Sequence, residues 1–189
     1  LVEFRQFHAK DDKVIIPQVF SEYSSKRVLT LSYEGGDGIA DTKHYPAAIR
    51  NEIGERLFHV LCEQMYHLQA LHCDSHPGNF AFRPDGSLVI YDFGCVKRLN
   101  PLLVGEMKRL VKAALANDYA TVESALRDLG IRTQIGEVPP EYYLEWIAIL
   151  LAPLQDKTLD FGHSQVHEQV LKQIKSLMKY WDSVQPSAE

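Results

Sequence analysis

The amino-acid sequence predicts an α+β fold, in which a small N-terminal β element precedes a mainly helical body with one embedded β-hairpin. Two patterns indicate this arrangement. Short runs of β-branched and aromatic residues lie before residue 34, and apolar residues recur at three- and four-residue steps from Pro46 onward. With 189 residues, of which 46% are hydrophobic, the chain is long enough for one good core or for one core plus a small appendage.

The N-terminal region is predicted to form three short strands, over residues 14–16, 19–23 and 27–33, with a hairpin turn at residues 24–26. We expect these strands to lack partners and to leave an exposed edge. A glycine-rich stretch at residues 35–38 follows. It suits a hinge or linker, because it lacks the G-x-G-x-x-G spacing of a phosphate-binding loop.

The helical body is predicted to begin with one long amphipathic helix. Pro46 suits its first position, and the apolar periodicity ends near Leu71. A loop over residues 72–79 and a hairpin of strands 80–82 and 88–91 follow, with a turn at Pro84-Asp85-Gly86. Four more helices are predicted, over residues 101–116, 119–129, 140–151 and 164–181.

Composition and charge narrow the classes of partner and compartment. The net charge is -5 and the 20 Lys and Arg residues are scattered, so we expect no nucleic-acid partner. Three cysteines without paired spacing do not form a disulfide framework, which favours a reducing compartment. The longest apolar run, residues 146–154, is shorter than the roughly 18 residues of a membrane span. We expect a cytoplasmic chain without signal peptide or membrane span.

The residues that indicate chemistry lie in the loop and just after the hairpin. The loop reads His72-Cys73-Asp74-Ser75-His76-Pro77-Gly78-Asn79, and Asp92-Phe93-Gly94 follows. Phosphoryl transfer from a nucleotide requires oxygen ligands for magnesium and a carboxylate near the attacking group. Asp74, Asn79 and Asp92 have these side chains at the spacing of the kinase H-R-D-x-x-x-x-N loop followed by D-F-G. The sequence therefore predicts a site for ATP and magnesium.

Other side chains of this loop have alternative interpretations. His76 either contacts a phosphate or braces the loop by a hydrogen bond, and His72 is better explained as a structural residue that fixes the loop. A zinc site from His72, Cys73, Asp74 and His76 is disfavoured, because adjacent ligands on one short loop rarely complete a tetrahedron. Cys73 and Cys95 flank the site, and we expect each to be a small buried hydrophobic residue.

The H-x-D-x-H-P-G-N and Y-D-F-G motifs, together with residues 16–19 and 24–30, resemble the UbiB (AarF) family of atypical kinases over nearly the whole chain. The resemblance implies a protein-kinase-like fold that binds ATP and magnesium and associates with membrane surfaces, here the inner membrane face. It also implies a role in ubiquinone or other isoprenoid-quinone biosynthesis. Residues 1–34 would be a remnant of the N-terminal lobe, 35–45 a hinge or linker, and 46–189 the C-terminal lobe.

The resemblance also implies individual roles. Asp74 matches the catalytic aspartate, Asn79 and Asp92 match the metal ligands, and Gly94 is a structural residue of the D-F-G motif. The hinge that contacts the nucleotide would consist of Leu31, Ser32 and Tyr33, although Ser32 stands where the family commonly has glutamate.

Several of the family's features are not found before Asp74: the K-x-G-Q signature, the alanine-rich loop, the nucleotide-binding lysine and its glutamate partner. Because the first residue is Leu1, we expect the chain to be part of a longer kinase or ATPase and to be inactive alone. Two alternatives stay open: a small-molecule phosphotransferase of the aminoglycoside or choline kinase type, and a non-catalytic lipid-binding or scaffold pseudokinase.

The substrate is predicted to be small or lipidic. Only residues 93–100 separate Asp92 from the expected helix at Pro101, which leaves no room for a long peptide-docking segment. One apolar stripe could touch a membrane or a quinone, but such stripes on helices are more often part of a core; it consists of Trp146, Ile147, Ile149, Leu150 and Leu151.

Overall fold

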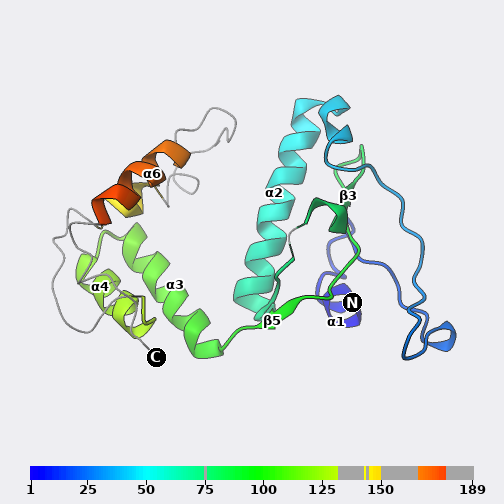
Figure 1. The fold of residues 1–189 in the computed structure, drawn as a ribbon, viewed down its shortest axis with the longest axis horizontal. Helices are drawn as coiled ribbons and strands as arrows, with labels where there is room; N and C mark the ends of the chain where they lie inside the picture. The colour runs from blue at the N-terminus through cyan, green and yellow to red at the C-terminus, as the bar shows by residue number, and fades with distance from the viewer. Residues whose placement is uncertain (75, 132–142, 144, 150–165, 178–189) are drawn as a thin grey trace. The chain divides into compact units, whose positions relative to one another are not determined.

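The computed structural model describes residues 1–74, 76–131, 143, 145–149 and 166–177. They belong to two compact units, Leu1–Asn100 and Pro101–Glu189. The described strands all lie in the first unit, which also holds the long helix α2 (Figure 1). The mixed α+β character predicted from the sequence is confirmed.

A three-stranded sheet lies at the centre of the first unit. β1 (Val14–Ile15) runs parallel to β4 (Leu88–Ile90), and β4 is antiparallel to β3 (Phe80–Phe82), which gives the order β1-β4-β3. Because β4 is the central strand, Leu88 and Val89 are fully buried. The expectation that the strands before Gly35 lack partners is therefore wrong for β1, whose apolar side chains enter the same core.

The hairpin predicted around Pro84-Asp85-Gly86 is confirmed as β3 and β4. Lys13 Nζ donates to Asp85 Oδ2 at 3.0 Å and the Ser87 N–H donates to Asp85 Oδ1 at 3.0 Å. These donors, Lys13 first, hold the pKa of the Asp85 carboxyl far below its usual range. Gly86 has a φ of 82°, and a Cβ there would lie 2.8 Å from the carboxylate of Glu52, so the turn requires glycine.

The predicted strands over residues 19–23 and 27–33 do not form regular ladders. Val19 pairs with Leu31 and Ser25 with Val28 only as isolated antiparallel bridges, and Ser21–Tyr23 forms a 3₁₀ helix (η1). The reason is a local side-chain interaction. Ser24 Oγ donates to the Phe20 carbonyl at 2.8 Å and accepts from the Thr30 N–H at 3.0 Å, so the serine takes the place of ladder bonds. The sequence also gave no signal for α1 (Val2–Phe7).

The predicted linker at residues 35–38 is irregular but is attached to β3. Asp37 and Phe82 exchange two backbone hydrogen bonds of 2.8 and 2.9 Å, and Tyr45 Oη donates to Asp37 Oδ2 at 2.6 Å. Burial first, and the neighbouring Asp37 next, raise the pKa of Tyr45 to about 12. A Cβ on Gly36 would lie 2.8 Å from Ala81 Cβ, so glycine permits this close approach to the hairpin. A 3₁₀ helix, η2 (Asp41–His44), follows.

The long helix is shorter than predicted. α2 spans Ala47–Glu63 with Pro46 as its N-cap, packs against β4, and continues as a π-helical turn, η3 (Gln64–Leu68). Gln69 then adopts a left-handed conformation with φ of 53°, which ends the helix. The expected end near Leu71 is wrong, because Ala70–His72 forms a strand, β2.

The second unit is helical where it is described. α3 (Pro101–Leu115) and α4 (Tyr119–Asp128) pack together and match the predicted helices to within one residue at each end; the N-cap Asp118 accepts from the Thr121 N–H at 3.1 Å. The predicted helix over 140–151 is seen as helical residues 143 and 145–149, and that over 164–181 as α6 (Val166–Leu177); their remaining residues lie outside the described ones.

The apolar stripe of the second unit belongs to its core. Trp146 and Ile147 pack against a buried cluster that includes Val122 and Tyr143, and Ile149 is buried. The residues that follow Ile149 in the predicted stripe, Leu150 and Leu151, lie outside the described part of the chain. Among the described helices, none has the length and hydrophobicity required to cross a membrane.

A buried histidine at the end of α1 makes the first unit sensitive to acid. His8 is 3% exposed, its Nδ1 lies 3.5 Å from Glu63 Oε2, and its Nε2 has no hydrogen-bond partner among the described residues. Burial lowers the pKa of His8, and the carboxylates of Glu63 and Asp11 offset part of this effect. The imidazole is therefore neutral in the folded state at pH 7.

We expect the free energy of unfolding of the first unit to fall as pH falls from about 7 through the usual histidine range. The unfolded chain takes up a proton at a higher pH than buried His8 does, so acid favours unfolding, and this contribution is complete only above the unfolded pKa. Hydrogen exchange of the β4 amides at several pH values measures it. His8→Gln should flatten the dependence, whereas the exposed His59→Gln should retain it. An equally steep dependence in His8→Gln would contradict the assignment.

Candidate active site

Two short strands bring the polar loop and the D-F-G segment together. β2 (Ala70–His72) pairs antiparallel with β5 (Val96–Arg98), with His72 opposite Val96. One step further, the Cys73 N–H donates to the Cys95 carbonyl at 2.9 Å. The residues after His72 and those before Val96 therefore lie side by side. The sequence did not reveal this pair, because each strand has only three residues and two of those in β5 are charged.

Asp74 and Asn79 form a hydrogen-bonded pair across the loop. Asn79 Nδ2 donates to Asp74 Oδ2 at 2.9 Å and to the Asp74 carbonyl at 3.2 Å, while Asp74 Oδ1 accepts from the His76 N–H at 3.2 Å. These bonds, from Asn79 first and His76 second, lower the pKa of the Asp74 carboxyl. The side chain of Asp74 is exposed, so an ionised carboxylate faces solvent at the predicted catalytic position.

Asp92 is placed beside this pair by the hairpin. The Tyr91 N–H donates to the Asn79 carbonyl at 2.9 Å, which continues the pairing of β3 with β4. Directly after it, Asp92 is exposed, and its Oδ1 accepts from the Gly94 N–H at 2.7 Å. A Cβ on Gly94 would lie 3.2 Å from the same oxygen, so glycine allows this tight turn. Asn79 and Asp92 thus lie just outside the paired strands at the same end of the hairpin, and Asp74 is hydrogen bonded to Asn79.

His72 connects the loop that contains Asp74 with the D-F-G segment that contains Asp92. The residue is 9% exposed; its Nε2 hydrogen bonds to the Asp92 carbonyl, and its Nδ1 accepts from the Asp74 N–H at 3.1 Å. The His72 N–H in turn donates to Oε1 of Gln64 at 3.2 Å, and Gln64 is buried. Sequence reasoning missed Gln64, whose only signal was an amide on an otherwise apolar helix face.

An aromatic stack supports the D-F-G segment. The ring of Phe93 lies 4.4 Å from that of Phe4 on α1 and 5.1 Å from that of His72, measured between centroids. Phe4 is 2% exposed and belongs to the core of the first unit. The helix α1 therefore packs directly against the segment that carries Asp92.

His76 caps a short 3₁₀ helix, η4 (Pro77–Asn79). Its Nδ1 accepts from the Gly78 N–H at 3.0 Å, and the Asn79 N–H donates to the His76 carbonyl at 2.9 Å. The hydrogen bond from the Gly78 N–H occupies the lone pair of His76 Nδ1, which a second ring proton would need.

The predicted hinge residues form hydrogen bonds with the segment around Gln18 and not with the described residues of the loop at 72–79. The Ser32 N–H donates to the Gln18 carbonyl at 2.8 Å, and Ser32 Oγ accepts from the Gln18 N–H at 2.9 Å. Leu31 takes part in the bridge to Val19, and Tyr33 is 94% exposed.

Glu34, which follows the predicted nucleotide hinge at residues 31–33, is bonded to the β3–β4 hairpin. Tyr91 Oη donates to the Glu34 carbonyl at 2.6 Å, and Arg83 pairs with the Glu34 carboxylate at 3.0 Å and donates to the Gly35 carbonyl at 2.8 Å. Arg83 and Tyr91 thus connect the end of the predicted hinge to the β3–β4 hairpin, which Asn79 precedes and Asp92 follows. The sequence offered no signal for either residue.

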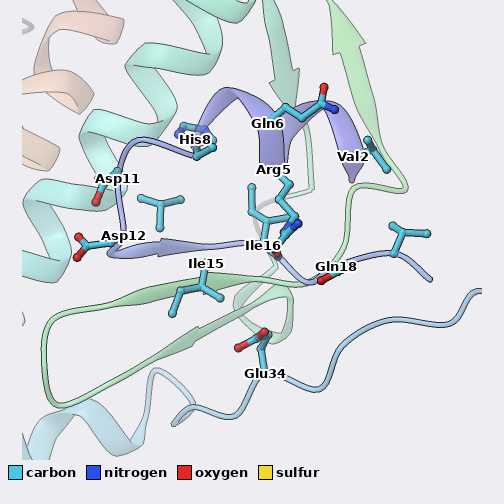
Figure 2. Close-up of a pocket in the computed structure, with 13 residues that line it drawn as sticks. Val2, Arg5, Gln6, His8, Asp11, Asp12, Ile15, Ile16, Gln18 and Glu34 are labelled. Carbon is cyan, nitrogen blue, oxygen red and sulfur yellow. The ribbon is translucent and has the colours of Figure 1, made fainter. Parts of the chain in front are cut away.

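Two cavities lie in the first unit. One of about 510 Å³ is lined by residues of α1 and β1 and by Glu34, and Figure 2 shows Arg5, Ile15 and Glu34 around it. The three predicted catalytic and metal-binding residues do not line it. The second, of about 330 Å³, is bordered by apolar side chains of α2 such as Phe58 and by His72 and Pro77 of the loop.

The donor set at the loop fits magnesium better than zinc. Among the described residues there is no group of three or more His, Cys, Asp or Glu side chains that could hold a metal ion. Carboxylate and amide oxygens that accompany nucleotide phosphates are typical ligands of magnesium. Asn79 donates through Nδ2, which leaves its Oδ1 available as such a ligand.

The cysteines differ from expectation. Cys73 and Cys95 are both exposed rather than buried, because they lie at the open end of the β2–β5 pair, whereas Cys62 on α2 is half-buried.

Comparisons with known proteins agree with these motifs. A family model described as the ABC1 atypical kinase-like domain matches residues 1–126. An uncharacterized protein of Synechocystis sp. is 35% identical over 143 residues, which cover 72% of this chain and 24% of that protein. An ABC1 family protein of Schizosaccharomyces pombe is 32% identical over 126 residues, or 64% of this chain and 24% of its own length.

More distant similarities extend further along the chain. The mitochondrial atypical kinase COQ8B of Danio rerio is 23% identical over 180 residues, or 94% of this chain and 29% of that protein. The structure of Rv3197 from Mycobacterium tuberculosis with erythromycin superposes with a TM-score of 0.73 at 22% identity, and covers 88% of this chain and 42% of that one. This likeness concerns the fold alone.

The chain spans 24% to 29% of the length of the curated relatives named here. Since the family model covers two thirds of the chain and includes both the loop and the D-F-G segment, the resemblance and the kinase-like fold predicted from the sequence are confirmed. The chain belongs to the family of ABC1 atypical kinase-like proteins.

Proposed function

We propose that this chain carries the ATP- and magnesium-binding site of an atypical kinase or ATPase, with Asp74, Asn79 and Asp92 at its centre. The observation that carries the proposal is their geometry. Asn79 is hydrogen bonded to Asp74, and its carbonyl accepts from the N–H of the residue before Asp92, so the three residues lie at the same end of the hairpin, with Asp74 and Asp92 exposed. The zebrafish relative is named an atypical kinase, which supports the same reaction class.

Each residue then has a separate task. Asn79, through Oδ1, and Asp92 would hold the magnesium ion. When bound, the ion would neutralise charge on the nucleotide phosphates. Asp74 would orient the attacking hydroxyl and accept its proton. Because Asn79 and the His76 N–H lower the pKa of Asp74, this carboxylate stays ionised and acts more by orientation than as a strong base.

We further propose that His76 braces the loop rather than contacting a phosphate as imidazolium. Its Nδ1 already accepts from the Gly78 N–H at 3.0 Å, within the turn that positions Asn79. This bond is available only to a ring whose Nδ1 is unprotonated.

An exchange of His76 tests this role. Asparagine presents Oδ1 near the place of histidine Nδ1 and can cap the same turn, so His76→Asn should retain nucleotide affinity, while His76→Ala should weaken it. Titration calorimetry between about pH 6 and 8 measures both affinities, and the wild-type affinity should not fall as pH rises. An affinity that falls as pH rises, and that His76→Lys makes independent of pH, would instead show a phosphate contact.

The acceptor is proposed to be small or lipidic. The cavity of about 330 Å³ beside the loop is lined almost entirely by apolar side chains, with Ile39 and Phe58 about half exposed at its edge. The finer roles rest on the family resemblance: a contribution to isoprenoid-quinone biosynthesis, peripheral contact with a membrane, and the division into lobes at residues 34 and 45. The zebrafish relative is named as a mitochondrial protein.

Binding of the nucleotide is the direct test. We expect the 189-residue chain to bind ATP only when magnesium is present, and a chelator of divalent cations should release the nucleotide, because the oxygen ligands act through the metal. Titration calorimetry with and without magnesium measures this. Equal affinity in both conditions would contradict the assigned metal site, and no binding in either would favour the alternative of a non-catalytic scaffold. The match to the ABC1 model leaves the aminoglycoside kinase alternative without support.

A further inference from the structure

Two exposed cysteines, Cys73 and Cys95, lie one residue beyond the paired strands β2 and β5, next to the proposed active site. The register of β2 and β5 pairs His72 with Val96, so the next residues outward, Cys73 and Cys95, are opposite each other. The Cys73 N–H donates to the Cys95 carbonyl at 2.9 Å, so the backbones of the two cysteines are adjacent just beyond the paired strands. Both side chains are exposed.

The spacing of such a pair suits a disulfide. Opposite residues in a hydrogen-bonded antiparallel pair have Cα atoms about 5.5 Å apart, which lies within the range of roughly 4.4–6.8 Å that disulfides span. Side chains of opposite residues also lie on the same face of the ladder. The Cys73 thiol donates a weak hydrogen bond of 3.4 Å to the Leu71 carbonyl, which does little to prevent rotation of the side chain.

We propose that Cys73 and Cys95 form a reversible disulfide, and that this bond weakens binding of the magnesium nucleotide. The second part rests on the proposed function. Cys73 directly precedes Asp74, and Cys95 directly follows Gly94, whose N–H holds the carboxylate of Asp92. A disulfide draws the two Cβ atoms to about 4 Å, closer than a hydrogen-bonded pair usually holds them. The bond therefore pulls on the two segments that position Asp74 and Asp92.

The oxidant is a low-molecular-weight disulfide such as oxidised glutathione. One protein thiolate attacks it, releases one glutathione thiol and leaves a mixed disulfide. The second protein thiolate then attacks the protein sulfur of that mixed disulfide and releases the second glutathione thiol. The two cysteines together lose two protons and two electrons, and the oxidant gains both as two thiols. Such reversible disulfides occur also in reducing compartments, where they act as redox sensors.

Cys62 provides the matched control. It is half-buried on α2, and burial raises the pKa of its thiol, so it is expected to react more slowly. It lies in the same unit as the pair but outside the β2–β5 ladder.

Peptide mapping tests the first part without any nucleotide. The full chain is equilibrated in mixtures of reduced and oxidised glutathione, alkylated, digested and examined by mass spectrometry. We expect a linked Cys73–Cys95 peptide in the wild type and in Cys62→Ala, its disappearance after reduction, and none in Cys73→Ser or Cys95→Ser. Only glutathione adducts, links to Cys62 or links between two chains would overturn the proposal.

Nucleotide binding tests the second part. Titration calorimetry with magnesium ATP should show an affinity about tenfold or more weaker for the oxidised chain, recovered on reduction, because displacement of groups that hold metal ligands typically costs 10- to 100-fold. Cys95→Ser should be insensitive to oxidation. A linked peptide with unchanged affinity would overturn the regulatory effect. If the reduced chain binds no nucleotide, the proposed function fails, and the mapping alone decides whether the disulfide forms.

Discussion

Asp92→Asn should reduce the affinity for magnesium ATP by about a hundredfold or more. Replacing groups that only support metal ligands costs 10- to 100-fold, so loss of a charged ligand is expected to reach at least the upper end. Asp92 has the position for this role, since its exposed carboxylate is fixed by the Gly94 N–H beside Asn79. Asp74→Asn should weaken binding less, because Asp74 orients the attacking group and is not assigned to the metal.

Titration calorimetry in saturating magnesium compares these variants. The matched control is Glu55→Gln, which removes an exposed carboxylate from α2, where Glu55 pairs only with His59 one helical turn away. Its affinity should equal that of the wild type. If Asp92→Asn binds as tightly as Glu55→Gln, Asp92 is not a ligand, and the assignment of the site to magnesium would have to be abandoned.

Phe4→Ala should destabilise the first unit by about 3–5 kcal/mol, the usual cost of removing a fully buried phenylalanine. Phe4 is 2% exposed and is the ring against which Phe93 packs, at a centroid distance of 4.4 Å. The truncation therefore leaves a cavity directly beneath the D-F-G segment. We expect nucleotide affinity to fall as well, because Phe93 loses the contact that fixes the backbone on either side of Asp92 and Gly94.

Hydrogen exchange of the β3 and β4 amides measures this loss of stability. Tryptophan fluorescence is not suitable, because both tryptophans, Trp146 and Trp181, belong to the second unit. Phe58→Ala is the matched control. Phe58 is 49% exposed on α2, so its truncation should cost much less. Equal protection of the β4 amides in Phe4→Ala and in the wild type would show that α1 contributes little to the core.

Several features of the site could be read from the sequence because they depend on local spacing. Five positions separate Asp74 from Asn79 (79 − 74), and the turn at Asp85-Gly86 returns the chain so that Asp92 lies beside them. The turn chemistry of Asp and Gly encodes the hairpin within a few residues. The helices α3 and α4 likewise followed from apolar periodicity and from the N-cap at Asp118.

Other features were decided only by the tertiary structure. The parallel pairing of β1 with β4, the pairing of β2 with β5, and the packing of Phe4 on Phe93 each join residues that are far apart in the chain. The segments involved are two to six residues long, too short for a periodic pattern to indicate their type or their partner. The facing positions of Cys73 and Cys95 follow from one of these pairings. The sequence by itself therefore determined which residues are proposed to hold a magnesium nucleotide. Long-range burial of small apolar segments decided how those residues are supported, because the free energy of such contacts depends on partners that no local pattern specifies.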